Sequence, residues 1–189
     1  MTTFTDSIKA FEVTPQKVLI SDINRQILVD WMIEITSGSS YFFDDTVHYA
    51  VSYMDRYLTK KVSPTLQKLA ATCVFIASKF NDIYPVSIED VLYFTSTVYL
   101  TKNELLNMEA DILTVLNFEL AKPNIKTFIL NSSPAININA DKALMMTPSK
   151  KPSEIASDIL ENNFEIYIPS QFTAINDKHK QSKKRKLVE

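Results

Sequence analysis

Glycine and cysteine each occur only once in this chain of 189 residues, as Gly38 and Cys73. Loops that cradle phosphate groups need several glycines, because only glycine takes positive φ freely, so phosphate-binding loops and dinucleotide-binding turns are excluded. The two histidines, His48 and His179, are far apart, and the sequence has neither zinc-ligand spacing nor a disulfide framework. We therefore expect no cofactor and no metal, and we expect Cys73 to be a small core residue.

The sequence has no recognisable signal peptide and no apolar run long enough to span a bilayer. A single cysteine also argues against an oxidising compartment. These features predict an intracellular, reducing location in the nucleus, the cytoplasm or both, and no membrane partner.

The net charge of −2 is unevenly distributed along the chain. Six of the 20 basic residues lie in residues 178–189, so residues 1–177 carry 14 basic against 21 acidic groups. Binding to nucleic acid needs clustered Lys and Arg on the folded part, so the acidic body predicts no nucleic-acid partner. The basic tail is a candidate nuclear-import signal through Lys183, Lys184, Arg185 and Lys186. A solvated tail without a function explains the same composition equally well.

Residues 64–82 form the most apolar stretch, and their hydrophobic residues recur at spacings of three and four. This pattern predicts a central helix, with Ser63 as N-cap and Pro64 in the first turn. Lys79 interrupts the pattern near the most apolar part of the chain, and a charge buried there needs a partner.

Four more helices are predicted around the central one. One runs from Asp22 to just before Gly38, and a second covers about 44–60. Ser87 precedes a third, and Thr101 with Glu104 has capping-box spacing before a fourth that ends near residue 116. With short loops and no convincing alternation, the sequence predicts an all-α fold.

The rest of the chain is less regular. Residues 1–21 predict at most one short helix, and residues 131–139 alternate Asn and Ile around Pro134. Residues 154–168 have the spacing of one amphipathic helix. We therefore divide the chain into an N-terminal segment 1–21, a helical module 22–128, a partly irregular region 129–177 and a tail 178–189.

Three segments of the module, NRQILVDW at 24–31, YMDRYL at 53–58 and ASKFNDIY at 77–84, resemble the N-terminal cyclin box of mitotic A- and B-type cyclins. The resemblance extends over about residues 7–128. It implies a five-helix cyclin box around a central helix. It also implies a non-catalytic regulatory subunit that binds and activates a cyclin-dependent kinase as a heterodimer and acts in cell-cycle control.

The resemblance also assigns roles to single residues. Arg25 and Asp55 match a buried structural ion pair, and Lys79 with Glu109 matches the pair through which cyclins hold a mobile helix of the kinase. Around that pair, an apolar surface that packs on the same kinase helix is matched by Ile76, Phe80, Ile83, Leu113, Phe118 and Leu120. Taken alone, apolar residues of this kind lie more often in a core.

A second surface matches the patch where cyclins dock substrates and inhibitors that carry an arginine-x-leucine motif. Its residues are Ile27, Leu28, Trp31, Glu34, Leu66 and Gln67. Asn24 stands where the family has methionine, which makes the patch more polar. Trp31 fits a half-buried core position equally well.

These cyclins carry a second five-helix box, which needs on the order of 80 to 100 residues. Residues 129–177 are too few, so we interpret them as a truncated remnant of that box. This leaves two alternatives open: a cyclin-like protein that binds the kinase or docks substrates without activating it, and a cyclin-fold scaffold or transcription factor without a kinase.

Two threonines, Thr14 and Thr147, are each followed by proline and, two residues later, by lysine. This Ser/Thr-Pro-x-Lys pattern is preferred by cyclin-dependent kinases, although so short a motif often arises by chance.

Overall fold

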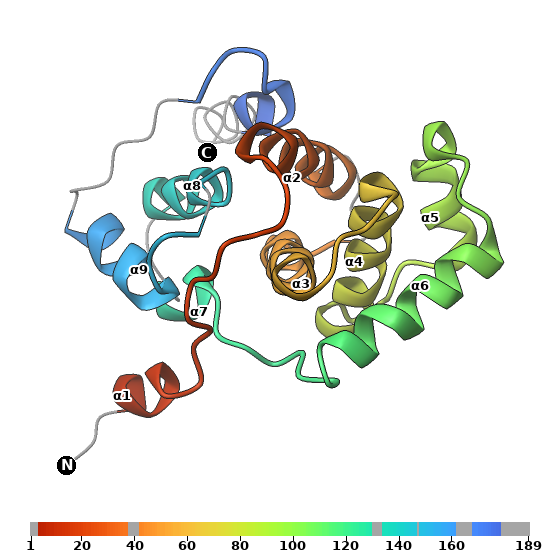
Figure 1. The fold of residues 1–189 in the computed structure, drawn as a ribbon. Helices are drawn as coiled ribbons and strands as arrows, with labels where there is room; N and C mark the ends of the chain where they lie inside the picture. Colours follow the sequence, from red (N-terminus) through yellow and green to blue (C-terminus); the bar gives the residue numbers. More distant parts are fainter. Residues whose placement is uncertain (1–3, 38–41, 130–133, 147, 162–167, 179–189) are drawn as a thin grey trace.

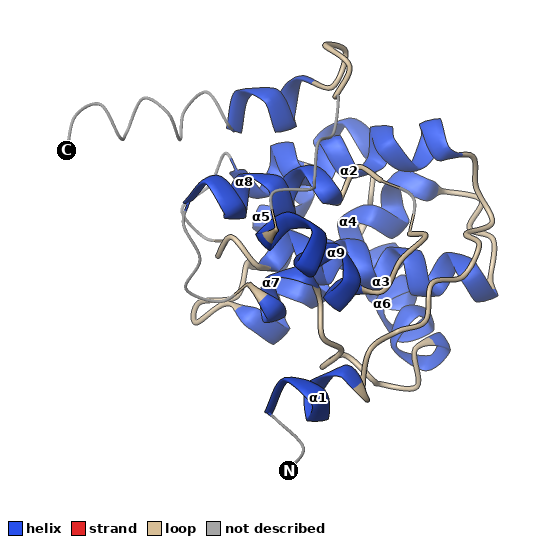
Figure 2. Cartoon of the chain, turned by 90° about the vertical axis from the view of Figure 1, so that its left-hand side faces the viewer, coloured by secondary structure: helices blue, strands red, loops and turns tan. Residues whose placement is uncertain are grey.

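The computed structural model describes residues 4–37, 42–129, 134–146, 148–161 and 168–178. All regular elements in these ranges are helical (Figures 1 and 2), which confirms the predicted all-α fold. In chain order they are α1 Phe4–Lys9, α2 Asp22–Ser37, α3 Thr46–Lys60, α4 Leu66–Asn81, α5 Ile88–Phe94, the short 3₁₀ helix η1 Ser96–Val98, α6 Lys102–Val115, α7 Ile125–Phe128, α8 Pro134–Ala143 and α9 Pro152–Leu160. Residues 173–178 are also helical.

Helix α4 is the centre of the larger group of helices, as the sequence predicted. It packs against α2, α3, α5 and α6 (Figure 1), and its buried residues run without a break from Leu69 to Ser78. The helix begins at Leu66 rather than Pro64, with Thr65 as N-cap. Ser63 instead accepts a hydrogen bond from the Thr65 N–H at 3.4 Å. Cys73 lies in this core, as expected.

Two of the three predicted N-terminal caps, Ser87 and Thr101, are present, whereas Ser63 is not the N-cap of α4. The Ser87 side chain accepts from the Asp90 N–H at the start of α5, and Thr101 and Glu104 form a reciprocal capping box on α6. Each cap satisfies N–H groups that have no partner within the helix, which defines where both helices begin. Gly38, the predicted stop of α2, lies outside the described residues.

The smaller group, α7, α8 and α9, builds its own hydrophobic cluster from residues such as Ile129, Ala140 and Ile159. Figure 2 shows these helices together on one side of the molecule. Within the region that the sequence predicts to be partly irregular, residues from Pro134 onward form helix α8, because proline suits a first helical turn and apolar residues follow at helical spacing. The expected helix over 154–168 is too long, since α9 ends at Leu160.

Side chains from distant parts of the chain fasten the smaller group to the larger one. The His48 Nε2 atom on α3 lies 2.9 Å from the Asp141 Oδ1 atom on α8. Phe172 and Ile175 are buried in the main core, and the Ile175 N–H donates to Asp30 on α2 at 2.9 Å. The described residues beyond 129 therefore pack back on the first helices.

Candidate functional site

The last turn of α4 and the middle of α6 bring Lys79 and Glu109 together. The Lys79 Nζ atom donates a hydrogen bond to Glu109 Oε1 and lies 4.1 Å from the centre of the Phe75 ring, a cation–π contact. The Lys79 side chain is 39% exposed, so the expectation of a buried lysine is wrong. Ser78 is the last buried residue of α4. The final turn of the helix, which carries the Lys79 ammonium group, therefore lies at the surface of the core.

Apolar side chains lie at or just after the C-terminal ends of the two helices that carry this ion pair. Phe80, Ile83 and Phe118 are all exposed, with 72% of Ile83 and 69% of Phe118 accessible. Leu113 and Leu120 are half-buried and pack against the main core. We call Lys79, Glu109, Phe80, Ile83 and Phe118 the α4–α6 surface. Exposed apolar groups beside a charged pair are typical of a protein-binding surface.

Ile76 does not belong to the α4–α6 surface. It is only 2% exposed and lies in the main core, so the structure corrects its assignment to an exposed binding surface. Helix α4 is apolar on nearly all sides, and the periodicity of such a helix does not show which side remains open to solvent.

The loop after α6 has an unusual backbone. Asn117 and Phe118 have φ angles of 53° and 57°, in the left-handed region that a bulky residue such as phenylalanine seldom occupies. The Phe118 N–H donates to the Leu113 carbonyl at 2.9 Å, which holds this conformation in place. A strained backbone that projects a large aromatic ring into solvent is typical of a functional site.

The Arg25 guanidinium connects three parts of the molecule. Its Nε and Nη2 atoms donate to the two carboxylate oxygens of Asp55, both at 2.8 Å, and its Nη1 donates to the Leu144 carbonyl at 2.8 Å. Arg25 is almost fully buried, and Asp55 is largely covered. The pair therefore joins α2 to α3 and also holds the loop after α8, a structural role and not a catalytic one.

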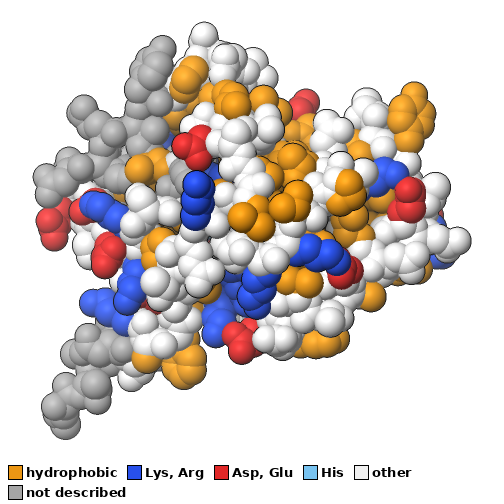
Figure 3. Space-filling view, viewed as in Figure 1, with side chains coloured by type: hydrophobic (Ala, Val, Ile, Leu, Met, Phe, Trp, Pro, Cys, Tyr) orange, Lys and Arg blue, Asp and Glu red, His pale blue; other side chains and the backbone are white. Residues whose placement is uncertain are grey.

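The predicted docking residues lie on α2 and α4, which pack side by side. Ile27, Glu34 and Gln67 are exposed, whereas Trp31 and Leu66 are half-buried against the core. Leu28 is 4% exposed, so it supports the patch from below and offers no surface for contact. Figure 3 shows hydrophobic side chains gathered over the α2 and α4 side of this face.

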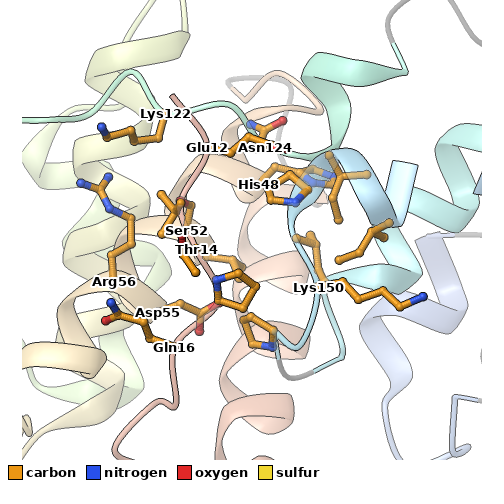
Figure 4. A pocket seen from close by; sticks show the side chains of 18 of the residues that line it. Glu12, Thr14, Gln16, His48, Ser52, Asp55, Arg56, Lys122, Asn124 and Lys150 are labelled. Atoms are coloured by element: carbon orange, nitrogen blue, oxygen red, sulfur yellow. The ribbon is translucent and has the colours of Figure 1, made fainter. Parts of the chain in front are cut away.

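Sequence reasoning missed a pocket of about 570 Å³ between α3, the N-terminal segment and the smaller helix group (Figure 4). Its lining includes Thr14, Arg56, Lys60, Lys122 and Lys150. These residues are distributed over the chain, and although Thr14, Arg56 and Lys150 each lie in a motif noted above, no motif indicated that they would line one pocket.

Within the described ranges, no group of three or more His, Cys, Asp or Glu side chains is arranged to hold a metal ion. None of the helices described is both long and apolar enough to cross a membrane. The import candidates Lys183, Lys184, Arg185 and Lys186 lie outside the described residues, as does Thr147.

Comparison with known proteins identifies this arrangement of helices. The family model "Cyclin, N-terminal domain" matches residues 3–121. Putative cyclin-A3-1 of Arabidopsis thaliana is 42% identical over 116 residues, which is 60% of this chain and 32% of that protein. Cyclin-A1-4 of Oryza sativa subsp. japonica is 32% identical over 152 residues, 79% of this chain and 42% of that protein.

Human cyclin-A2 is 37% identical over 123 residues, 61% of this chain and 28% of that protein. The chain thus spans less than half the length of each of these relatives. An X-ray structure of a viral cyclin from herpesvirus saimiri superposes with a TM-score of 0.64 at 26% identity, covering 85% of this chain and 82% of that one. The chain belongs to the cyclin family of non-catalytic kinase regulatory subunits, and it is related to the A-type cyclins.

Proposed function

We propose that this chain binds a cyclin-dependent kinase through the α4–α6 surface, activates it and so acts in cell-cycle control. The observation that carries the proposal is the Lys79–Glu109 pair between α4 and α6, together with the exposed side chains of Phe80, Ile83 and Phe118 at the ends of these two helices. The relatives are themselves named cyclins, which supports a kinase as partner.

The chemistry of the pair suits a polypeptide partner. Lys79 makes one hydrogen bond within the described part of the chain, so two of its N–H groups remain for carbonyl oxygens of a partner. Glu109 has a second carboxylate oxygen for an N–H group. A partner helix laid across the surface would bury the three apolar side chains and exclude water from these hydrogen bonds.

Activation then follows from differential binding. A kinase samples inactive and active positions of its mobile helix, and a subunit that contacts only the active position shifts the population toward it. In the active position, the mobile helix completes an ion pair between a lysine and a glutamate of the kinase itself. It also completes the kinase's magnesium site, on which phosphoryl transfer depends. The cyclin contributes binding energy and does no chemistry of its own.

The test is phosphate transfer to a model substrate by a purified cyclin-dependent kinase, together with its affinity for this chain. We expect Lys79→Ala combined with Glu109→Ala to weaken binding about 30-fold, which corresponds to about 2 kcal/mol. The matched control removes another ion pair between the same two helices, Lys68 with Glu104 at 2.6 Å. Lys68→Ala with Glu104→Gln keeps the acceptor of the α6 cap and is expected to leave binding unchanged.

The same assay separates the alternatives. Binding without a rise in kinase activity would favour a non-activating partner. Absence of binding to every cyclin-dependent kinase tried would favour a scaffold use of the fold and overturn the proposal.

A second surface supports a further step of this function. We propose that Ile27, Trp31 and Leu66 receive the leucine, and Glu34 the arginine, of substrates or inhibitors with an arginine-x-leucine motif. Exposure of Ile27 and Glu34 beside two half-buried apolar side chains supports this. Competition by a peptide with this motif against substrate phosphorylation tests it, and a peptide with both residues replaced by alanine is the control.

A further inference from the structure

Residues 12–19 form a strap between the two groups of helices. The Glu12 carboxylate accepts hydrogen bonds from the N–H and the hydroxyl of Ser153, at 2.6 and 2.8 Å, at the start of α9. At the other end, the Leu19 N–H donates to the Leu58 carbonyl of α3 at 2.9 Å. The strap is therefore fastened at both ends, and its middle borders the pocket of Figure 4.

Thr14 lies in the middle of this strap, directly before Pro15. Residues 12–18 have no regular secondary structure, and Thr14 is exposed. Proline biases the preceding residue toward an extended backbone, the form in which a peptide enters the cleft of a kinase. Thr14 is thus an accessible hydroxyl in a Thr-Pro-x-Lys context.

Positive side chains line the same pocket. Arg56 Nη1 donates to the Glu119 carbonyl at 2.7 Å, and Lys60 Nζ donates to the Val115 carbonyl at 2.9 Å. Neither forms an ion pair with a carboxylate among the residues that the structure describes, so both have spare donors. In Figure 4 the labelled side chains of Thr14, Arg56 and Lys122 lie on the same side of the pocket, and Figure 3 shows Lys and Arg side chains gathered near the middle of this face.

The acidic side chains of the pocket are already engaged. Asp55 is paired with Arg25, Glu12 with Ser153, and Asp158 accepts from Lys150 at 2.6 Å. Glu119 is paired with Lys122 at 2.8 Å, so Lys122 already has a carboxylate partner whereas Arg56 and Lys60 do not. A new anion on Thr14 would therefore meet donors with spare capacity on Arg56 and Lys60.

We propose that Thr14 is a phosphorylation site for a proline-directed Ser/Thr kinase, and that Arg56, with Lys60 and Lys122, holds the phosphate and tightens the strap across the two helix groups. In the step, Thr14 Oγ1 forms a bond to the γ-phosphorus of ATP while the bond from that phosphorus to the leaving ADP oxygen breaks. The hydroxyl proton passes to the base of the kinase. The phosphate carries a charge of about −1.5 to −2 and three acceptor oxygens, enough for a bidentate contact with a guanidinium.

This inference is independent of the proposed function, because the modifying kinase need not be activated by this chain. The experiment uses a cyclin-dependent kinase already active with another cyclin, ATP, and this chain as wild type, Thr14→Val, Pro15→Ala and Arg56→Gln. Phosphopeptide mapping locates the phosphate. The Tm before and after the reaction measures whether the phosphate strengthens the attachment of the strap to the two helix groups. A model substrate in the same tube verifies the kinase.

We expect phosphate on Thr14 of the wild type and a rise in Tm of about 3 °C, which Thr14→Val loses completely. We expect Pro15→Ala to reduce the rate of modification at Thr14 at least tenfold. Arg56→Gln is expected to be phosphorylated at the normal rate but to lose the rise in Tm. Should Arg56→Gln fail to fold, Lys60→Gln takes its place, with at least half of the rise lost.

An unmodified Thr14 beside a phosphorylated model substrate would overturn the proposal. An equal rise in Tm without these cations would overturn the assigned phosphate site.

Discussion

The His48 Nε2 atom of α3 lies 2.9 Å from the Asp141 Oδ1 atom of α8, at a fully buried contact between the two helix groups. Lys178 Nζ lies 3.3 Å from the other oxygen of Asp141, and Lys126 Nζ lies 3.7 Å from Oδ1. The His48 Nδ1 atom is buried with no hydrogen-bond partner among the described residues. A neutral ring that donates from Nε2 fits this environment, because protonation of Nδ1 would bury an unsatisfied N–H.

The environment sets the direction of both pKa values. Burial lowers the pKa of His48 below its usual 6.5, and the hydrogen bond to Asp141 offsets this only in part. Burial by itself would raise the pKa of Asp141, but the hydrogen bond from His48 and the charge of Lys178 outweigh it and leave that pKa below 3.8. Both groups therefore bind fewer protons in the folded state than in the unfolded state.

A loss of stability at acid pH follows. The unfolded state takes up the His48 proton near pH 6.5, so the free energy of unfolding should fall by up to about 1.4 kcal/mol per pH unit below that value. Asp141 adds a further loss below about pH 4. Urea unfolding between pH 7.5 and 5 measures the first effect. His48→Gln, which keeps a side-chain donor toward Asp141, should remove most of the slope, and an unchanged slope would contradict the assignment.

The buried Arg25–Asp55 pair should dominate the electrostatic stability of the larger helix group. Asp55→Ala leaves a buried guanidinium without its carboxylate, so we expect unfolding to become easier by about 3–5 kcal/mol. The control is Lys61→Ala, which removes the exposed pair of Lys61 with Asp111 and should cost under about 1 kcal/mol. The urea midpoints of unfolding measure both variants. An equal loss of unfolding free energy in the two variants would show that burial does not make the Arg25–Asp55 pair more stabilising than an exposed pair.

The five main helices were accessible from sequence because local signals specified them. The Thr101–Glu104 capping box marks the start of α6, and apolar spacing marks the extent of α4. Family resemblance paired Lys79 with Glu109. Burial at single positions was harder to predict: Ile76 and Leu28 turned out to be core residues because the direction in which a helix is covered depends on its neighbours.

Contacts between distant residues were beyond sequence reasoning. Ser153 meets Glu12 although 141 positions separate them, and the Leu144 carbonyl meets Arg25 across 119 positions. Helix α8 was not predicted, because its alternating Asn and Ile give a weak helical period. Its residues Ala140 and Ala143 are nevertheless buried against neighbouring helices.

Phe118 should contribute to kinase binding far more than to stability. Because its ring is 69% exposed, Phe118→Ala should change the free energy of unfolding by less than about 0.5 kcal/mol, yet it should weaken kinase affinity at least tenfold. Tyr99→Ala is a closely matched control, since Tyr99 is an exposed aromatic residue that also has positive φ. Titration calorimetry measures both affinities. A similar loss for Tyr99→Ala would argue against a specific role of the α4–α6 surface.

Cys73 should be inert in the folded protein. Burial raises the pKa of its thiol, so the reactive thiolate is suppressed and the sulfur is inaccessible. A chromogenic disulfide reagent should therefore label Cys73 in the native chain only as fast as the structure around α4 opens. In urea, the same reagent should label Cys73 at once. Because Cys73 is the only cysteine of the chain, all of the labelling signal comes from this residue. Rapid labelling in buffer would show that α4 opens locally.

Ile27 tests the docking patch without disturbing the core. We expect Ile27→Ala to weaken binding of an arginine-x-leucine peptide about tenfold, since an exposed apolar side chain covered by the peptide leucine contributes about 1–1.5 kcal/mol. Ile23→Ala is the control, because Ile23 is similarly exposed one turn earlier on α2. Fluorescence anisotropy of a labelled peptide measures both. Kinase activation toward a substrate without the motif should be unchanged in either variant, since neither residue belongs to the α4–α6 surface. A tenfold loss for Ile23→Ala as well would mean that the peptide follows a different path along the helix.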